Sequence, residues 1–97
     1  MTAKVIGLIE LTDQNAFEQY RNKVGQTVEL YKGSVQNRGS VTEIFWNELN
    51  CARFGAFVEL TFPSQEDAKA WAHSPGYQAL VAIRNRAMKL TLFAVTI

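Results

Sequence analysis

The stretch FGAFVELTFPSQEDAKAWAHSPGYQALVAIRNRA, residues 54–87, decides the fold because it joins a strand to a helix that is broken once. Its first nine residues, Phe54–Phe62, are rich in aromatic and β-branched side chains and predict a strand, which Pro63 ends. The helix that follows is interrupted at Ser74-Pro75, since serine caps a helix and proline suits the first helical position. The stretch therefore predicts a strand followed by a helix in two parts.

Outward from this stretch, the chain predicts one further helix and three further strands. Asp13 is a good N-cap for a long helix with apolar residues at helical spacing, and Gly33 suits its C-terminal cap. Gly39 predicts a bend or bulge within the second strand. The further predicted strands are Lys4–Leu11, Val35–Leu49 and Lys89–Ile97.

The order of these elements is strand, helix, strand, strand, broken helix, strand. This is the βαββαβ order of ferredoxin-like α+β folds, and we expect residues 1–97 to form one such domain with a four-stranded antiparallel sheet. The strands carry large apolar side chains on both faces, so helices on one face leave the other uncovered. Because such an exposed face usually marks an interface, we expect a homodimer that buries it sheet against sheet.

Composition excludes several classes of function. Ten Lys and Arg residues against nine Asp and Glu give a net charge of +1, which is too balanced for a nucleic-acid or anionic-membrane surface. One cysteine and one histidine are too few for an internal disulfide or a His/Cys zinc site, so we expect no metal. The sequence has no apolar run long enough for a membrane span, and its first residues are typical of a strand rather than of a signal peptide. We therefore expect a cytoplasmic protein. No phosphate-binding loop, dinucleotide fingerprint or nucleophile elbow occurs, so we expect no cofactor.

Arg84 is the most informative single position, because it falls on the apolar stripe of the last helix, near Tyr77 and Leu80 on a helical wheel. An inward-facing guanidinium there would bind a carboxylate or another oxyanion of a ligand. Alternatively, its stem packs while its head reaches solvent or pairs with a buried glutamate. The sequence leaves both interpretations open.

Other candidate residues lie near glycine or near the helix break. Arg38 precedes Gly39, which allows close approach of a ligand, although an exposed cation at a sheet edge is the alternative. His73 and Tyr77 flank the helix break and are candidates for a base and a proton donor. For His73, a role at the surface or at the helix end is the alternative interpretation.

Two strand glutamates, Glu10 and Glu59, form a further candidate pair. If their strands lie side by side, the carboxylates shift each other's pKa and are able to do acid–base work. The alternative is that each faces solvent or pairs with an arginine.

The segment Phe62–Arg84 resembles the domain-of-unknown-function family numbered 1330, and the resemblance extends more loosely over nearly the whole chain. It is carried by a Phe-Pro-Ser strand end, Ala-Trp before the helix break, Ser-Pro-x-Tyr-Gln, and the following Leu-x-x-x-Arg. That family is similar to the dimeric α/β-barrel superfamily, so the resemblance implies a ferredoxin-like protomer in a dimeric α/β barrel. The matching motif positions here are Arg38, Ser74, Tyr77 and Arg84.

Two positions depart from the family pattern. Ser34 stands where a second glycine is common, and Thr61 stands where such sequences usually have an acidic residue. Glu59, two residues earlier on the same strand face, is the carboxylate that would substitute for it.

These observations lead to competing hypotheses of function. The first is a pocket between helices and sheet that binds a small acidic or aromatic molecule, with Arg38, Tyr77 and Arg84 as its ligand-binding residues. The wider superfamily includes cofactor-independent monooxygenases and isomerases, so such an enzyme is an alternative, with His73, Tyr77 and Glu59 as candidate catalytic residues. The third hypothesis is a non-catalytic dimeric module.

Overall fold

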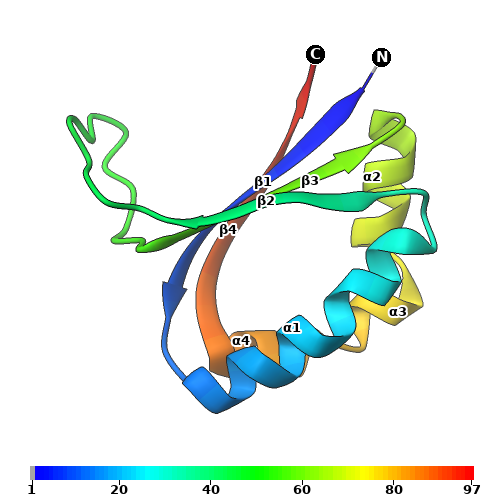
Figure 1. The fold of residues 1–97 in the computed structure, drawn as a ribbon, viewed down its shortest axis with the longest axis horizontal. Coiled ribbons are helices and arrows are strands. Elements are labelled where there is room, and N and C mark those ends of the chain that lie inside the picture. The colour runs from blue at the N-terminus through cyan, green and yellow to red at the C-terminus, as the bar shows by residue number, and fades with distance from the viewer. Residues whose placement is uncertain (1) are drawn as a thin grey trace.

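A four-stranded antiparallel sheet carries all of the helices on one of its faces (Figure 1). The computed structural model describes residues 2–97, and the strand order is β2-β3-β1-β4. The predicted ferredoxin-like βαββαβ arrangement is therefore confirmed. None of the helices in the described range is long and apolar enough to cross a membrane. The elements are β1 (Ala3–Leu11), α1 (Gln14–Glu29), β2 (Ser34–Ser40), β3 (Ala56–Phe62), α2 (Gln65–Ala72), α3 (Pro75–Gln78), α4 (Val81–Ala87) and β4 (Met88–Thr96).

The helix break at Ser74 is built into the core. The buried Ser74 Oγ donates a hydrogen bond to the Trp71 carbonyl (2.7 Å) and accepts one from the Tyr77 N–H (3.1 Å). The helix predicted to run to Ala87 is divided once more, between α3 and α4, because the Leu80 N–H bonds to the carbonyl three residues before it (2.9 Å). These turns bring Tyr77 and Leu80 into the core.

Trp71 lies at the centre of that core and joins three helices to the sheet. It is 1% exposed, and its indole Nε1 donates a hydrogen bond to Thr27 Oγ1 of α1 (3.0 Å). Its ring centroid lies 5.5 Å from that of Phe62 in β3 and 4.5 Å from that of Tyr77 in α3. Aromatic packing of this kind adds to the free energy gained from burial alone.

The prediction that Gly33 forms the C-terminal cap of α1 is wrong. Lys32, not Gly33, adopts the left-handed backbone conformation, with φ 67°. Gly33 is required for space instead: a Cβ there would lie 2.5 Å from the Phe62 ring and 2.8 Å from Val28 Cγ1. The side chains of α1 and β3 therefore meet over this glycine.

The predicted second strand, Val35–Leu49, is wrong beyond Ser40. β2 and β3 pair only as far as Ser40, and residues 41–55 form a loop between them. Within this loop the Asn47 side chain donates to the Cys51 carbonyl (2.9 Å) and accepts from the Cys51 N–H (3.0 Å). This local turn chemistry overrides the β-propensity of the loop's aromatic residues.

The irregularity predicted near Gly39 is a bulge slightly earlier in β2, where the register shifts between Val35 and Asn37. Without the extra residue, Val35 and Arg38 would point to opposite faces, since side chains alternate along a strand. With it, Arg38 lies opposite Val58 and shares the helix-covered face with Val35. The bulge therefore directs Arg38 toward the helices.

The opposite face, here called the outer face, carries apolar side chains, and none of the helices in residues 2–97 lies over them (Figure 1). Ile6 lies opposite Phe93 in the β1–β4 pair, and Leu8 lies opposite Phe57 in the β1–β3 pair. Phe93 and Val95 are 44% and 40% exposed. The uncovered apolar face predicted from the strand pattern is therefore present.

Candidate functional site

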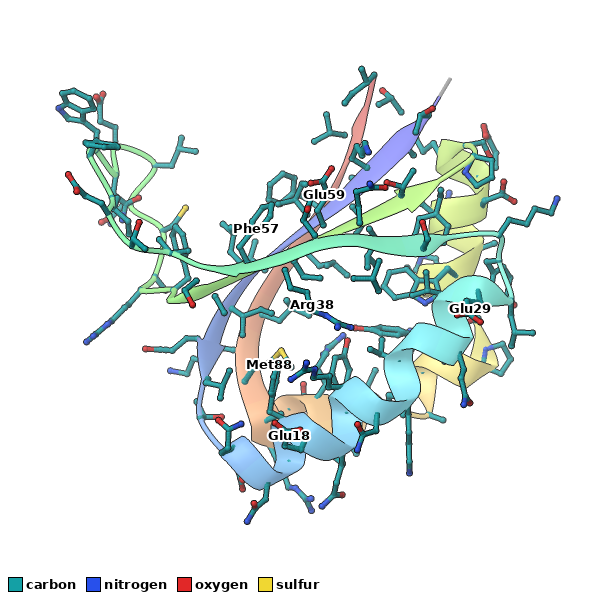
Figure 2. The ribbon with its side chains drawn as sticks, in the orientation of Figure 1. Glu18, Glu29, Arg38, Phe57, Glu59 and Met88 are labelled. Carbon is teal, nitrogen blue, oxygen red and sulfur yellow. The ribbon has the colours of Figure 1, made fainter. Side chains whose placement is uncertain are left out.

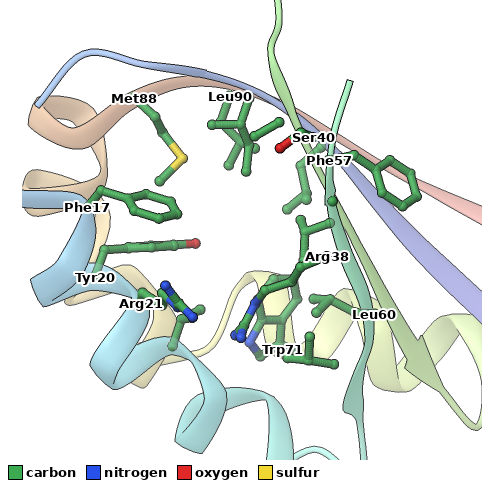
Figure 3. A pocket seen from close by; sticks show the side chains of 17 residues that line it. Phe17, Tyr20, Arg21, Arg38, Ser40, Phe57, Leu60, Trp71, Met88 and Leu90 are labelled. Carbon is green, nitrogen blue, oxygen red and sulfur yellow. The ribbon is translucent and has the colours of Figure 1, made fainter. Parts of the chain in front are cut away.

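A cavity of about 360 Å³ lies between α1 and the helix-covered face of the sheet (Figure 3). Most of its walls are apolar, with Phe17 from α1, Leu60 from β3, Trp71 from α2, and Met88 and Leu90 from β4. Its size and apolar walls are typical of a site for a small organic molecule.

Two guanidinium groups, Arg21 from α1 and Arg38 from β2, line the rim of this cavity and point toward its interior in Figure 3. Figure 2 likewise shows Arg38 between β2 and α1. Within residues 2–97, no carboxylate lies at ion-pair distance from either arginine. The cavity therefore combines apolar walls with two positive charges at its rim, of which only Arg38 was predicted from the sequence.

Behind the cavity wall, three side chains form a hydrogen-bonded row. Arg84 Nη1 donates to Tyr77 Oη (3.1 Å), and Tyr77 Oη lies 3.0 Å from Tyr20 Oη. The Arg84 guanidinium carbon also lies 5.7 Å from the centre of the Tyr77 ring. Tyr20 lines the cavity, whereas Tyr77 is 2% exposed and separates Tyr20 from Arg84.

Burial sets the ionisation of the residue in this row that lines the cavity. Burial raises the pKa of the Tyr20 phenol far above its ordinary value, and the adjacent Tyr77 hydroxyl raises this pKa further. The positive charge of Arg84 opposes the shift as a smaller effect. At neutral pH, Tyr20 therefore presents a neutral hydroxyl group to the cavity.

The three predicted ligand-binding residues lie near one cavity, but only one of them lines it. Arg38 lines the cavity directly, whereas Tyr77 and Arg84 lie one layer behind Tyr20. The alternative that Arg84 pairs with a buried glutamate is wrong, because its partner is the Tyr77 hydroxyl. No carboxylate among the described residues lies within ion-pair distance of Arg84.

The other candidate catalytic residues lie outside the cavity. His73 is an exposed residue at the C-terminal end of α2. Glu59 is on the outer face (Figure 2), where it lies 3.3 Å from Lys4 Nζ and accepts a hydrogen bond from Asn37 (3.0 Å). The Asn37 hydrogen bond, with a smaller contribution from Lys4, lowers the pKa of Glu59.

The predicted pair of carboxylates does not form. In the sheet register, Glu59 lies opposite Ile6, whereas Glu10 lies opposite Lys89, four residues farther along β1. The strands are neighbours as expected, but the register separates the two side chains, and a pattern within one strand does not determine that register.

Tyr20 and Arg21 are two cavity-lining residues with polar groups that the sequence did not indicate as site residues. Tyr20 belongs to the apolar stripe of α1, where an aromatic residue predicts a core position rather than a hydroxyl facing a cavity. Arg21 resembles an ordinary charge on the solvent side of a helix. The pairing of Tyr20 with Tyr77, 57 residues away, depends on how α1 packs against α3.

Several solved structures share this fold at low sequence identity. The RPA0582 protein of unknown function from Rhodopseudomonas palustris has a TM-score of 0.76 and 16% identity, over 97% of this chain and 80% of that chain. A dimeric ferredoxin-like protein of unknown function from Jannaschia sp. CCS1 has a TM-score of 0.68 and 10% identity, over 100% of each chain. SnoaB, a cofactor-independent oxygenase from Streptomyces nogalater, has a TM-score of 0.68 and 8% identity, over 99% of this chain and 92% of that chain.

Among curated proteins, none matches this chain. One family model does match it, and the match spans residues 2–97. The structural neighbours include dimeric ferredoxin-like proteins, in agreement with the strand order described above. The match over nearly the whole chain shows that this protein belongs to the domain of unknown function family DUF1330.

Proposed function

We propose that this protein binds a small organic acid with an apolar, preferably aromatic, body in the cavity between α1 and the sheet. The observation that carries the proposal is the presence of Arg21 and Arg38 at the rim of a mostly apolar cavity, with no carboxylate partner in residues 2–97. A guanidinium fork matches a carboxylate in shape and charge. Apolar walls favour burial of the rest of the ligand. The charge at the rim and the apolar interior thus fit the two ends of one such molecule.

Calorimetric titration with trans-cinnamate and its neutral amide, cinnamamide, tests this proposal. We expect cinnamate to bind more tightly than the amide, and Arg38→Met to weaken cinnamate binding about five- to tenfold. The expected effect is about 1 kcal/mol because the guanidinium is exposed and partly screened. Arg53→Met is the matched control, since it removes the same charge from an exposed position in the 41–55 loop, outside the cavity.

Two results would count against the proposal. One is equal affinity of the wild-type protein for cinnamate and for cinnamamide. The other is a double variant, Arg21→Met with Arg38→Met, that keeps the wild-type affinity for cinnamate.

We also propose that the protein forms a homodimer, in which the outer faces of two sheets pack against each other. Support comes from the apolar residues of that face, including Ile6 and Phe93, and from the dimeric ferredoxin-like neighbours. The 41–55 loop rises beside the same face, on the side away from the helices (Figure 1). Its Phe45 and Trp46 are 74% and 81% exposed and would extend the apolar contact with a second copy.

Catalysis on the bound molecule, as a cofactor-independent oxygenase, is the second candidate function. The observation in its favour is the Tyr20 hydroxyl in an apolar cavity, in a fold that SnoaB also has. An oxygen electrode with the protein, a hydroquinone and a metal chelator tests it. Oxygen uptake above the protein-free rate, and lost in Tyr20→Phe, supports this candidate, whereas uptake equal to that rate opposes it.

A further inference from the structure

The direction of the two hydrogen bonds in the Arg84–Tyr77–Tyr20 row follows from the chemistry of Arg84. A guanidinium group only donates hydrogen bonds, so Tyr77 Oη accepts from Arg84 Nη1 across 3.1 Å. The Tyr77 proton then has one acceptor among residues 2–97, the Tyr20 oxygen 3.0 Å away. The reverse order would make Tyr77 accept twice and leave its own proton unpaired in a site that is 2% exposed.

Tyr20 is therefore an acceptor toward Tyr77, and its own proton is free for another partner. No hydrogen bond in the described part of the chain uses that proton, apart from the shared contact with Tyr77. Tyr20 lines the cavity, and Figure 3 shows its hydroxyl directed into it. A tyrosine phenol is protonated at neutral pH, and the raised pKa of Tyr20 extends this to higher pH. A positive charge at the far end of a hydrogen-bonded row strengthens the last donor.

We infer that the Tyr20 hydroxyl is a specificity-determining hydrogen-bond donor, which selects ligands with an acceptor oxygen inside the cavity. Arg84 and Tyr77 are positioning residues that fix the direction of this donor. The inference rests on the proposed function, because the same ligand has its carboxylate at the arginine rim. The ligand class is thereby narrowed to aromatic or apolar acids that carry an acceptor oxygen in addition to the carboxylate, such as a ketone carbonyl.

Two probes of nearly the same shape test the donor. 4-Acetylbenzoate and 4-isopropenylbenzoate differ in having a carbonyl oxygen or a methylene group at the same place. We expect the wild-type protein to bind the acetyl probe about five- to tenfold more tightly, because only the carbonyl accepts a hydrogen bond. In Tyr20→Phe this ratio should fall to about one, while affinity for the isopropenyl probe stays at the wild-type value.

Tyr31→Phe is the matched control, since it removes a tyrosine hydroxyl outside the cavity, and it should keep the wild-type ratio. Arg84→Met is a second variant. It removes the donor that fixes the direction of the hydrogen bonds, and Arg84 does not line the cavity. We expect it to lower the ratio of the two probe affinities as well. A merely structural role for Arg84 would weaken both probes equally. Circular dichroism verifies that each variant is folded before titration.

The outcomes separate the donor from the proposed function. If both probes bind the wild-type protein and the ratio is about one, or if Tyr20→Phe keeps the wild-type ratio, the donor assignment is overturned and the binding of aromatic acids stands. If neither probe binds, the proposed function is overturned, and the donor role that rests on it falls as well.

Discussion

Arg84 shows how a charged residue is accommodated on an apolar helix stripe when none of the carboxylates in residues 2–97 pairs with it. The Tyr77 hydroxyl accepts a hydrogen bond from its guanidinium, and the Tyr77 ring lies within cation–π distance. The helical spacing placed Arg84 on the apolar stripe and left the direction of its guanidinium group open. The spacing also placed Tyr77 beside Arg84, but it did not predict the contact between Tyr77 and Tyr20, because Tyr20 lies on a different helix.

The raised pKa of Tyr20 should make the folded protein less stable at alkaline pH. Its pKa is raised in the folded protein by burial, so the folded state holds the phenol proton more tightly than the unfolded chain, where the pKa of a tyrosine is about 10. This contribution to stability is therefore fully present below about pH 10 and is lost as the pH rises above that value. We expect the free energy of unfolding in urea to decline more steeply above about pH 10 in the wild-type protein than in Tyr20→Phe.

The comparison between the two proteins isolates Tyr20, because the other titrating groups are common to both. Parallel pH profiles for the wild-type protein and Tyr20→Phe would contradict the assigned burial of this hydroxyl.

At the scale of elements, the order of strands and helices was predictable, whereas the element ends that shape the site were not. The break at Ser74 has a local cause, a serine cap followed by proline, and so it was visible in the sequence. The end of β2 at Ser40 and the bulge after Val35 depend on pairing with β3. Because the bulge directs Arg38 into the cavity, the residue was predictable as a candidate, but its orientation was not.

Substitution of Gly33 should disturb the packing between α1 and β3. A methyl group at Gly33 would lie 2.5 Å from the Phe62 ring, so Gly33→Ala should lower the free energy of unfolding by about 1–3 kcal/mol, as overpacking of a core does. The measurement is urea-induced unfolding followed by tryptophan fluorescence, since Trp71 packs against Phe62.

Gly25→Ala is the control for this substitution. Gly25 lies within α1, and a Cβ there meets no heavy atom within 4 Å, so alanine should raise stability by about 0.5–1 kcal/mol through its helix propensity. Stabilisation by both alanines would show that the space around Gly33 is not limiting.

At the scale of the whole molecule, the two faces of the sheet have different proposed functions: one binds the ligand and the other forms the dimer contact. The helix-covered face holds both the core around Trp71 and the cavity beside α1. None of the helices in residues 2–97 covers the outer face (Figure 1). Pairing with a second copy would therefore bury the outer face while leaving the cavity of each protomer on the far side of its own sheet.

Phe93→Glu tests this arrangement. The substitution puts a carboxylate on the outer face opposite Ile6, where a partner sheet would remove it from water, so we expect the dimer to dissociate into monomers. Sedimentation velocity at micromolar concentration measures the change. Leu30→Glu makes the same change at an exposed residue that follows α1, away from the outer face, and should leave a dimer. A monomeric wild-type protein, or dimeric Phe93→Glu protein, would rule out the outer face as the interface.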